Sequence, residues 1–401
     1  MALPARPSHT AYDVVIVGGG IMGAAVGFFL ARDPAFRGRV LVVERDPSYE
    51  RAATSLTNSC IRQQFGTEVN VRISQFTARF LKDFRDWMGD AEAPESLPIQ
   101  SFGYLYLAGT EARAAELRRA QALQARLGAA TEVLSPEEIA ARWPFYDLDG
   151  VVLGTHNPVD EGYFDGGTVF DWFRRRGRAL GVEYIHGEVT GLEMSGERIG
   201  HVVLGSGERL AVGHLVNAAG TRAPAIAAMA GCALPIEPRR RFTYVFEAAE
   251  PLPVDLPLTI DPSGVHMRTE GRLYMAGCPP LEDPAVDVDD FDDHPEIWEE
   301  RVWPALAARV PAFERIRLRH SWVGQYDFNL MDQNALLGPH PDCTNLICAN
   351  GFSGHGLQQA PAVGRGLAEL IVHGGYRELD LGDLSADRLR TGKPLLESAI
   401  I

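Results

Sequence analysis

One stretch near the N-terminus, VVIVGGGIMG at residues 14–23, constrains the fold of this chain more than any other feature. Its first four residues form an almost purely β-branched run, which predicts a buried parallel strand. Gly18, Gly20 and Gly23 follow in GxGxxG spacing, and the apolar, alanine-rich residues 21–31 predict a helix that packs closely on a sheet.

A second buried strand, RVLVVER, follows the helix and places Glu44 at its end. Strand, glycine turn, helix and acidic residue together form the βαβ unit of a dinucleotide-binding site. Gly18 permits the tight turn, Gly20 lets the backbone approach a pyrophosphate, and Gly23 lets helix and strand pack. The helix N-terminus stabilises the phosphate charge, and Glu44 accepts hydrogen bonds from ribose hydroxyls. The unit alone leaves FAD and NAD open.

Composition excludes several other functions. A chain of 401 residues predicts two domains, and a net charge of −15 argues against nucleic acid and anionic membranes as partners. No apolar run reaches the roughly 20 residues of a membrane span, and residues 1–13 lack the apolar segment of a secretory signal. The 5 cysteines show no CxxC pairing, which predicts reduced thiols and no metal site. We therefore expect a soluble cytoplasmic protein.

Three later segments resemble further parts of a nucleotide-binding fold. Residues 181–193 predict a strand, a turn and another strand. Residues 214–224, HLVNAAGTRAP, predict an apolar strand that ends in small residues where backbone can approach a ligand. Residues 346–371 predict a strand, the turn GFSGHG and a helix whose N-terminus points at an electron-rich group.

The order of these elements resembles the D-amino-acid oxidase/glycine oxidase/sarcosine oxidase family of FAD enzymes, over nearly the whole chain. Two segments, SLTNSCIRQQFG at 55–66 and YDFNLMDQNALLGPHP at 326–341 with the following NGFSGHGLQQAPAVGR, narrow the resemblance. They are similar to the FAD-dependent oxidoreductase domain proteins linked to complex I assembly, and the first also resembles the sarcosine oxidase β subunit. The resemblance implies that the glycine turn holds the pyrophosphate of FAD.

The resemblance also implies an architecture of mixed α/β and α+β class. A Rossmann-like FAD-binding domain is intertwined with an antiparallel-sheet substrate domain. We expect the FAD-binding domain to comprise residues 11–90, 150–230 and 320–401, and the substrate domain to comprise 91–149 and 231–319.

Two charged segments lie in the predicted substrate domain. The acidic stretch LEDPAVDVDDFDDHPE at 281–296 lacks the spacing of a calcium loop, so we expect a solvated loop. Arg239, Arg240 and Arg241 fall on a predicted strand, where neighbouring side chains alternate between faces, so they cannot all face one cavity.

The chemistry that the resemblance implies is hydride transfer from a carbon that bears an amine to the flavin, which gives an imine that water hydrolyses. The chain shows no Ser-His-Asp, Cys-His or paired-carboxylate pattern for hydrolysis. The motifs and the resemblance assign the following residues to the cofactor: Gly18, Gly20, Ile21, Met22, Gly23, Glu44, Arg45, Ser55, Thr57, Asn58, Cys60, Val189, Ala218, Ala219, Gly220, Gly324, Gly351, Ser353, Gly354, His355, Gly356, Leu357 and Gln358.

Arginine is the first candidate for the substrate, because its planar fork binds a carboxylate through two charge-assisted hydrogen bonds. Arg268, in MRTEGR, resembles the carboxylate-binding arginine of glycine and D-amino-acid oxidases, although Met267 stands where the family has proline. Gln358 occupies the position of a carboxylate-binding lysine in monomeric sarcosine oxidases, and Arg62 is the candidate to replace the lost charge, with a salt bridge that fixes its loop as the alternative. Other predicted lining groups are His355, Tyr326 and His266.

The mode of flavin attachment also follows from the resemblance. Monomeric sarcosine oxidases tether the flavin through a cysteine at the position of Gly324, which has no side chain to form a thioether. Residues 54–60 lack the histidine that some relatives use, and a single thiol such as Cys60 is more often inert packing. We therefore predict non-covalent FAD, with backbone groups of residues 354–357 facing the pyrimidine end of the flavin.

Three functions remain open at this point. The first is oxidation of an amino acid or secondary amine of the N-substituted amino acid class. The second is oxidation of a 2-hydroxy acid, which needs the same carboxylate anchor. The third is a flavoprotein assembly factor with little catalysis. The sequence leaves open whether oxygen or a quinone accepts the electrons.

Overall fold

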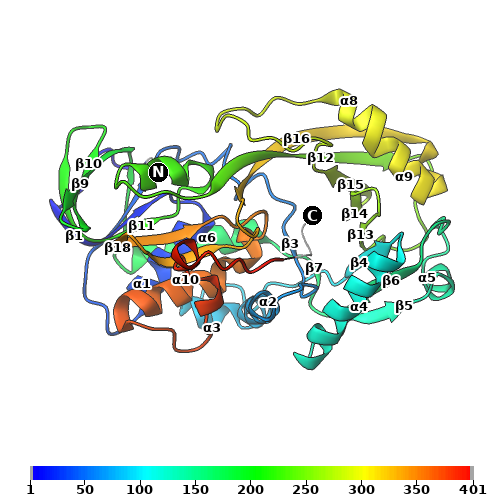
Figure 1. The fold of residues 1–401 in the computed structure, drawn as a ribbon, viewed down its shortest axis with the longest axis horizontal. Helices are drawn as coiled ribbons and strands as arrows, with labels where there is room; N and C mark the ends of the chain where they lie inside the picture. The colour runs from blue at the N-terminus through cyan, green and yellow to red at the C-terminus, as the bar shows by residue number, and fades with distance from the viewer. Residues whose placement is uncertain (1–2, 398–401) are drawn as a thin grey trace.

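The structure, a computed structural model, describes residues 3–397. It contains two 8-stranded sheets, and the chain passes from one to the other several times (Figure 1). This arrangement confirms the predicted mixed α/β class. In the first sheet, β1 pairs in parallel with β2 and with β11. Its strands in spatial order are β17 (Leu336–His340), β18 (Cys343–Asn350), β11 (Arg209–Asn217), β1 (Ala11–Val17), β2 (Val40–Glu44) and β8 (Glu183–His186), with β10 (Arg198–Leu204) and β9 (Val189–Ser195) extending from β11.

Both faces of the first sheet are covered, which explains why β1 reads as a continuous apolar run rather than an alternating one. Val14 and Ile16 pack in a core with α1 and α10, whereas Val15 and Val17 belong to a second core on the opposite face. Gly364 lets α10 lie directly on α1, because a Cβ at this position would come 2.8 Å from a backbone atom of α1. The helices of this half are α1 (Ile21–Arg32), α2 (Glu68–Lys82), α3 (Phe84–Met88), α6 (Gly166–Ala179), α7 (Ala223–Ala228), α10 (Gly356–His373) and α11 (Arg388–Thr391).

The second sheet is mostly antiparallel, and its two long strands run side by side along the top of Figure 1. Its strands in spatial order are β16 (Ile316–Asn329), β12 (Ile236–Ala248), β15 (Leu273–Cys278), β14 (His266–Glu270), β13 (Leu258–Ile260), β4 (Tyr104–Ala108), β6 (Leu153–Asn157) and β5 (Glu132–Leu134). The flanking helices are α4 (Glu111–Arg126), α5 (Pro136–Arg142), α8 (Pro295–Ile297) and α9 (Trp303–Arg309). A small pair, β3 (Cys60–Ile61) with β7 (Gly162–Tyr163), lies between the two sheets.

The sheet pairing divides two segments differently from the predicted domain boundaries, which stay a prediction. The expected division gave residues 150–230 and 320–401 to the FAD-binding domain. However, β6 and the whole of β16 are strands of the second sheet. The chain therefore crosses between the two sheets at residues 158–165 and again near residue 330, because β16 continues its pairing with β12 as far as Asn329.

Among the helices within residues 3–397, none combines the length and the apolar character needed to cross a bilayer.

A buried carboxylate, Glu161, holds the segment that connects β3 to α2. It accepts hydrogen bonds from the backbone N–H groups of Gln63 and Gln64 at 2.5 and 3.1 Å, and from the Asn157 side chain at 3.0 Å. At the other end of the segment, Glu397 accepts from the Gly66 N–H at 2.7 Å. Two carboxylates from distant parts of the chain thus fix the backbone on both sides of this segment.

The protonation of Glu161 makes stability depend on pH. Burial raises its pKa from 4.5 to about 7. Because the folded-state pKa lies above the unfolded one, the stability contribution of the protonated form is complete below pH 4.5 and is lost as pH rises toward 7. We expect wild type to lose about 3 kcal/mol more than Glu161→Gln over this range. Urea unfolding of both FAD-loaded proteins at several pH values measures the difference, and parallel pH dependences would contradict it.

Candidate functional site

One cavity of about 400 Å³ collects most of the residues that the sequence singles out. It is lined by the turn after β1, the end of β2, many of residues 45–62, the turn after β11, parts of β12 and β16, and the start of α10. The predicted cofactor residues in this lining are Gly18, Gly20, Ile21, Met22, Glu44, Arg45, Thr57, Asn58, Cys60, Val189, Ala218, Ala219, Gly220, Gly324, Ser353, Gly354, His355, Gly356, Leu357 and Gln358. Gly23, Ser55 and Gly351 lie outside it.

The glycine turn after β1 has the conformation that its residue types require. Gly18 adopts a φ of 96°, and a Cβ on it would overlap the carbonyl oxygen of Ala218. A Cβ on Gly23 would overlap the carbonyl oxygen of Gly18, so α1 approaches the turn only because this residue is glycine. Gly20 instead faces the cavity and meets only the Thr54 hydroxyl, at 3.0 Å from an added Cβ. The cradle beside Gly20 therefore fits a group that approaches the backbone closely.

Glu44 lies beside this turn at the end of β2. Its carboxylate accepts from the Gly19 N–H and from the Asp46 N–H, both at 2.7 Å. Burial raises the pKa of Glu44, while these two backbone N–H groups act to lower it. Each oxygen keeps a lone pair after one accepted bond, so the carboxylate can still accept from hydroxyl groups of a ligand.

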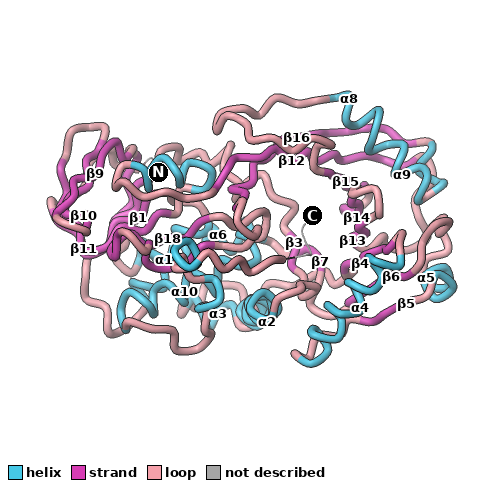
Figure 2. Tube along the Cα trace, in the orientation of Figure 1, coloured by secondary structure: helices cyan, strands magenta, loops and turns pink. Residues whose placement is uncertain are grey.

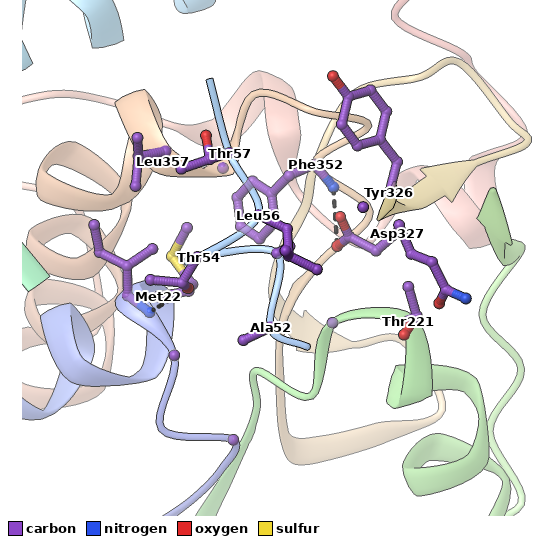
Figure 3. Close-up of a pocket in the computed structure, with 18 of the residues that line it drawn as sticks. Met22, Ala52, Thr54, Leu56, Thr57, Thr221, Tyr326, Asp327, Phe352 and Leu357 are labelled. Carbon is purple, nitrogen blue, oxygen red and sulfur yellow. Dashed lines mark hydrogen bonds between the residues drawn. The ribbon is translucent and has the colours of Figure 1, made fainter. Parts of the chain in front are cut away.

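The turn that begins α10 is held by Asp327 (Figure 3). The carboxylate accepts from the Gly351 N–H at 2.7 Å and from the Phe352 N–H at 3.2 Å. Burial raises the pKa of Asp327 to about 6. Gly354 has a φ of 91° and lies against the ring of Tyr326, where a Cβ would overlap. These contacts explain why Gly351 serves the turn rather than the cavity wall.

Arg62, His355 and Gln358 meet at the end of the cavity formed by the start of α10. Arg62 is only 4% exposed; its backbone N–H donates to the Gln358 side chain at 2.9 Å. Its guanidinium donates to Nε2 of His355 at 2.9 Å, because arginine has no acceptor atom. Burial, followed by the Arg62 charge, lowers the pKa of His355 well below its usual range, so this histidine is neutral. The structure thus brings together three residues that are up to 296 positions apart.

His266 and Tyr326 also line the cavity. Burial lowers the pKa of His266 to about 4, with further lowering by the charges of Arg268, Arg241 and Arg62. Nε2 of the neutral ring lies 3.3 Å from the side-chain amide of Asn58. The charge of this part of the cavity therefore comes from arginines and not from histidine.

Arg268, the first substrate candidate from the sequence, does not line the cavity. Its side chain forms an ion pair with Glu270 and donates to the carbonyl oxygens of Thr269 at 2.9 Å and Asn58 at 3.2 Å. The local pattern MRTEGR could not reveal this, because it contains both partners of the ion pair without showing that they meet. This placement favours Arg62 over Arg268 as a partner of a substrate.

Several cavity residues that no sequence motif marks lie on β12 and on the loop that precedes α8. Arg241 faces the cavity, and Phe242 and Thr243 follow it in the lining. The acidic segment is not merely a solvated loop, because Val288 and Asp289 also line the cavity. Figure 2 shows this loop leading into α8 alongside β12 and β16. Alternation of side chains along Arg239, Arg240 and Arg241 shows that these three cannot all face the cavity. It does not show which of the three faces it.

The cysteines and the residue at position 324 bear on covalent attachment of a cofactor. The cysteines are free thiols, and burial raises the pKa of Cys60, so the thiol in the cavity wall is protonated. A Cβ at Gly324 would lie 3.0 Å from the carbonyl oxygen of Leu56, which leaves little room for a side chain there. Within residues 3–397, no group of three or more histidine, cysteine, aspartate or glutamate residues is placed to hold a metal ion.

Comparison with known proteins agrees with the fold and with the glycine turn. A family model described as FAD dependent oxidoreductase matches residues 13–370. FAD-dependent oxidoreductase domain-containing protein 1 of Xenopus laevis is 38% identical, over 97% of this chain and 85% of the relative. Sarcosine oxidase subunit beta of Rhizobium meliloti is 27% identical, over 90% of this chain and 85% of the relative. The crystal structure of L-proline dehydrogenase from P. horikoshii has a TM-score of 0.83 at 25% identity and covers 98% of this chain and 100% of its own. The chain therefore belongs to the family of FAD-dependent oxidoreductases.

Proposed function

We propose that this protein oxidises the C–N bond of an amino acid whose amine carries a second carbon substituent, giving an imine that water hydrolyses. The observation that carries the proposal is the buried guanidinium of Arg62 in the cavity wall, beside the neutral ring of His355. Two proteins similar to this chain are named for sarcosine and L-proline, which are both amino acids with a secondary amine.

Arg62 is the proposed anchor of the substrate carboxylate. A guanidinium that is removed from water binds a carboxylate more strongly than an exposed one does, because the low local dielectric strengthens the attraction. Glu161 and Gln358 fix the backbone on both sides of Arg62, so the anchor loses little freedom on binding. Bound FAD supplies the hydride acceptor, and the chain holds the substrate by its carboxylate so that the reacting carbon has one orientation.

The residues proposed to hold FAD lie along the rest of the cavity. The open backbone at Gly20 and the N-terminus of α1 receive the pyrophosphate, and Glu44 accepts from ribose hydroxyls. The turn at residues 354–357 begins α10, and its backbone N–H groups would hold the flavin end of FAD and favour negative charge there. Asp327 orders this turn from behind.

Anaerobic mixing with a substrate panel tests the proposal. The panel contains N-alkyl amino acids, imino diacids, primary D- and L-amino acids, and 2-hydroxy acids, and flavin bleaching is followed by absorbance. Reduction by the N-alkyl compounds supports the proposal. Reduction by 2-hydroxy acids alone would replace it with the alternative oxidation. Absence of reduction across the panel would contradict it and favour a flavoprotein without this catalysis.

The two candidate arginines should differ in how much each contributes to substrate binding. Arg62→Ala should weaken binding of a carboxylate substrate by about 2–5 kcal/mol, roughly 30- to 5000-fold in Kd, because a desolvated charge pair is lost. Arg268→Ala should have the smaller effect, since Arg268 pairs with Glu270 away from the cavity lining. Flavin absorbance titrations measure both, and retained FAD serves as the folding control. A larger loss in Arg268→Ala would return the anchor to that residue.

A side chain at Gly20 in the glycine turn should interfere with FAD binding. Gly20→Val should lose FAD, because the side chain occupies the space beside the open backbone of the turn. Gly375→Val is the matched control, since a Cβ there meets nothing within 4 Å. The ratio of flavin to protein after purification is the measurement. A fully yellow Gly20→Val protein with a wild-type ratio would refute this account of the turn.

The attachment of FAD to the protein is also open to test. We expect FAD to be held without a covalent bond, because Gly324 has no side chain and the Cys60 thiol is protonated in the wall. Acid precipitation should then give a colourless pellet and a yellow supernatant. A pellet that stays yellow, with a fluorescent protein band on a denaturing gel, is the opposite result.

A further inference from the structure

A second arginine, Arg241, lines the same cavity as Arg62. Its guanidinium lies over the ring of Tyr326, 4.8 Å from the ring centroid. The Tyr326 ring in turn packs against Gly354, whose neighbour His355 accepts the hydrogen bond from Arg62. A continuous line of contacts therefore joins the two arginines along one wall of the cavity.

Arg241 already binds a carboxylate from this chain. Asp283 accepts from both terminal nitrogens of the guanidinium, at 2.8 and 2.9 Å. The side chain of Arg241 is only 11% exposed, so this fork lies in an environment where charge-assisted bonds are strong. The geometry demonstrates that the fork of Arg241 accommodates a carboxylate in two-point contact.

Asp283 can leave Arg241 without losing every cationic partner. Its carboxylate also lies 3.3 Å from Arg239, which points to the same side of β12 but is absent from the cavity lining. Asp283 belongs to the loop between β15 and α8, where Leu281 is 86% exposed. The loop is anchored further on, where the Val286 N–H donates to the carbonyl oxygen of Pro238 at 3.0 Å and the Gln325 side chain donates to the carbonyl oxygens of Asp287 and Asp290. The stretch around Asp283 therefore lacks a packed apolar anchor.

We propose that Arg241 is a second carboxylate-binding residue of this cavity and that Asp283 occupies it when substrate is absent. The inference rests on the proposed function and narrows it. The substrate class becomes a secondary amine with two acid groups, one held by Arg62 and the other by Arg241 in place of Asp283. The C–N bond to be oxidised then lies between the two anchors.

The surrounding charges are consistent with a second acid group. Among residues 3–397, Arg241 forms an ion pair with Asp283, and Asp283 also pairs with Arg239, which in turn pairs with Glu237 at 3.2 Å. The other ionisable side chain in contact with Arg241 is that of Tyr326, which lies under the guanidinium. His266 adds no charge, because it is neutral above a pKa of about 4. When Asp283 withdraws toward Arg239, Arg241 is left with an unmatched positive charge that the second carboxylate of a ligand neutralises.

Matched ligand pairs test the inference in the FAD-loaded protein. Iminodiacetate is compared with N-ethylglycine, and N-(2-carboxyethyl)glycine with N-propylglycine, so that each pair differs by one carboxylate at similar size. Dissociation constants come from anaerobic flavin absorbance titrations and, independently of turnover, from ligand-induced shifts of Tm. We expect at least one diacid to bind about tenfold or more tightly than its monoacid partner.

Three variants assign the preference to residues. Arg241→Gln should reduce the ratio of the two dissociation constants to about one, because the diacid loses its second anchor. Asp283→Asn should increase the ratio, because the internal competitor loses its charge. Arg240→Gln, on the same strand but on its opposite face and outside the lining, is the control that should retain the diacid preference.

The results separate the two proposals. Equal binding within both pairs in wild type, or a diacid preference that survives Arg241→Gln, would overturn the role of Arg241 and leave amine oxidation standing. Failure of every N-alkyl amino acid, with either one or two acid groups, to bind or to reduce the flavin would overturn the proposed function and this inference with it.

Discussion

The burial of the Arg62 guanidinium is the interaction on which the candidate site depends. A charged group that is removed from water is costly unless hydrogen bonds and opposite charges compensate for it. Here His355 at the start of α10 accepts a hydrogen bond from the guanidinium, and the centroid of the Phe65 ring lies 4.4 Å from the guanidinium carbon. Gln358, also on α10, and Glu161, on the connection between β6 and β7, accept from the backbone N–H groups of Arg62 and Gln63 and so hold the segment that carries the side chain. The need to place these groups around one side chain ties the two sheets to each other at the end of the cavity.

The same constraint explains which residues have perturbed protonation. His355 and His266 are neutral because burial and nearby arginines both oppose a further positive charge. Glu161 and Asp327 have raised pKa values because burial outweighs the backbone N–H groups that stabilise their anions. Both carboxylates order backbone segments of the cavity wall, so their perturbed pKa values reflect a structural role next to the site.

Local sequence predicted the parts of the molecule that local interactions determine. The β1–α1–β2 unit follows from a β-branched run, a glycine spacing and an acidic residue within 31 consecutive positions, 14–44. The domain boundaries were harder, because the whole of β16 belongs to the second sheet and nothing in its sequence marks the point near residue 330 where the chain leaves that sheet. Arg268 was favoured over Arg62 because its motif is recognisable, although an ion pair with Glu270 two positions away removes it from the cavity. Which arginine of a cluster faces a cavity depends on strand register, and register is set by pairing across the sheet.

The register of β12 gives its arginines different surroundings. Residues 239 and 241 share one face and share Asp283, whereas Arg240 points to the other face and pairs with Asp290 and His294. The acidic loop before α8 thus supplies carboxylates to arginines on both faces of β12. The net negative charge of the chain, −15, therefore coexists with arginine-lined parts of the cavity. The net charge therefore bears on the outer surface and its macromolecular partners, whereas a buried guanidinium determines recognition of a small anion.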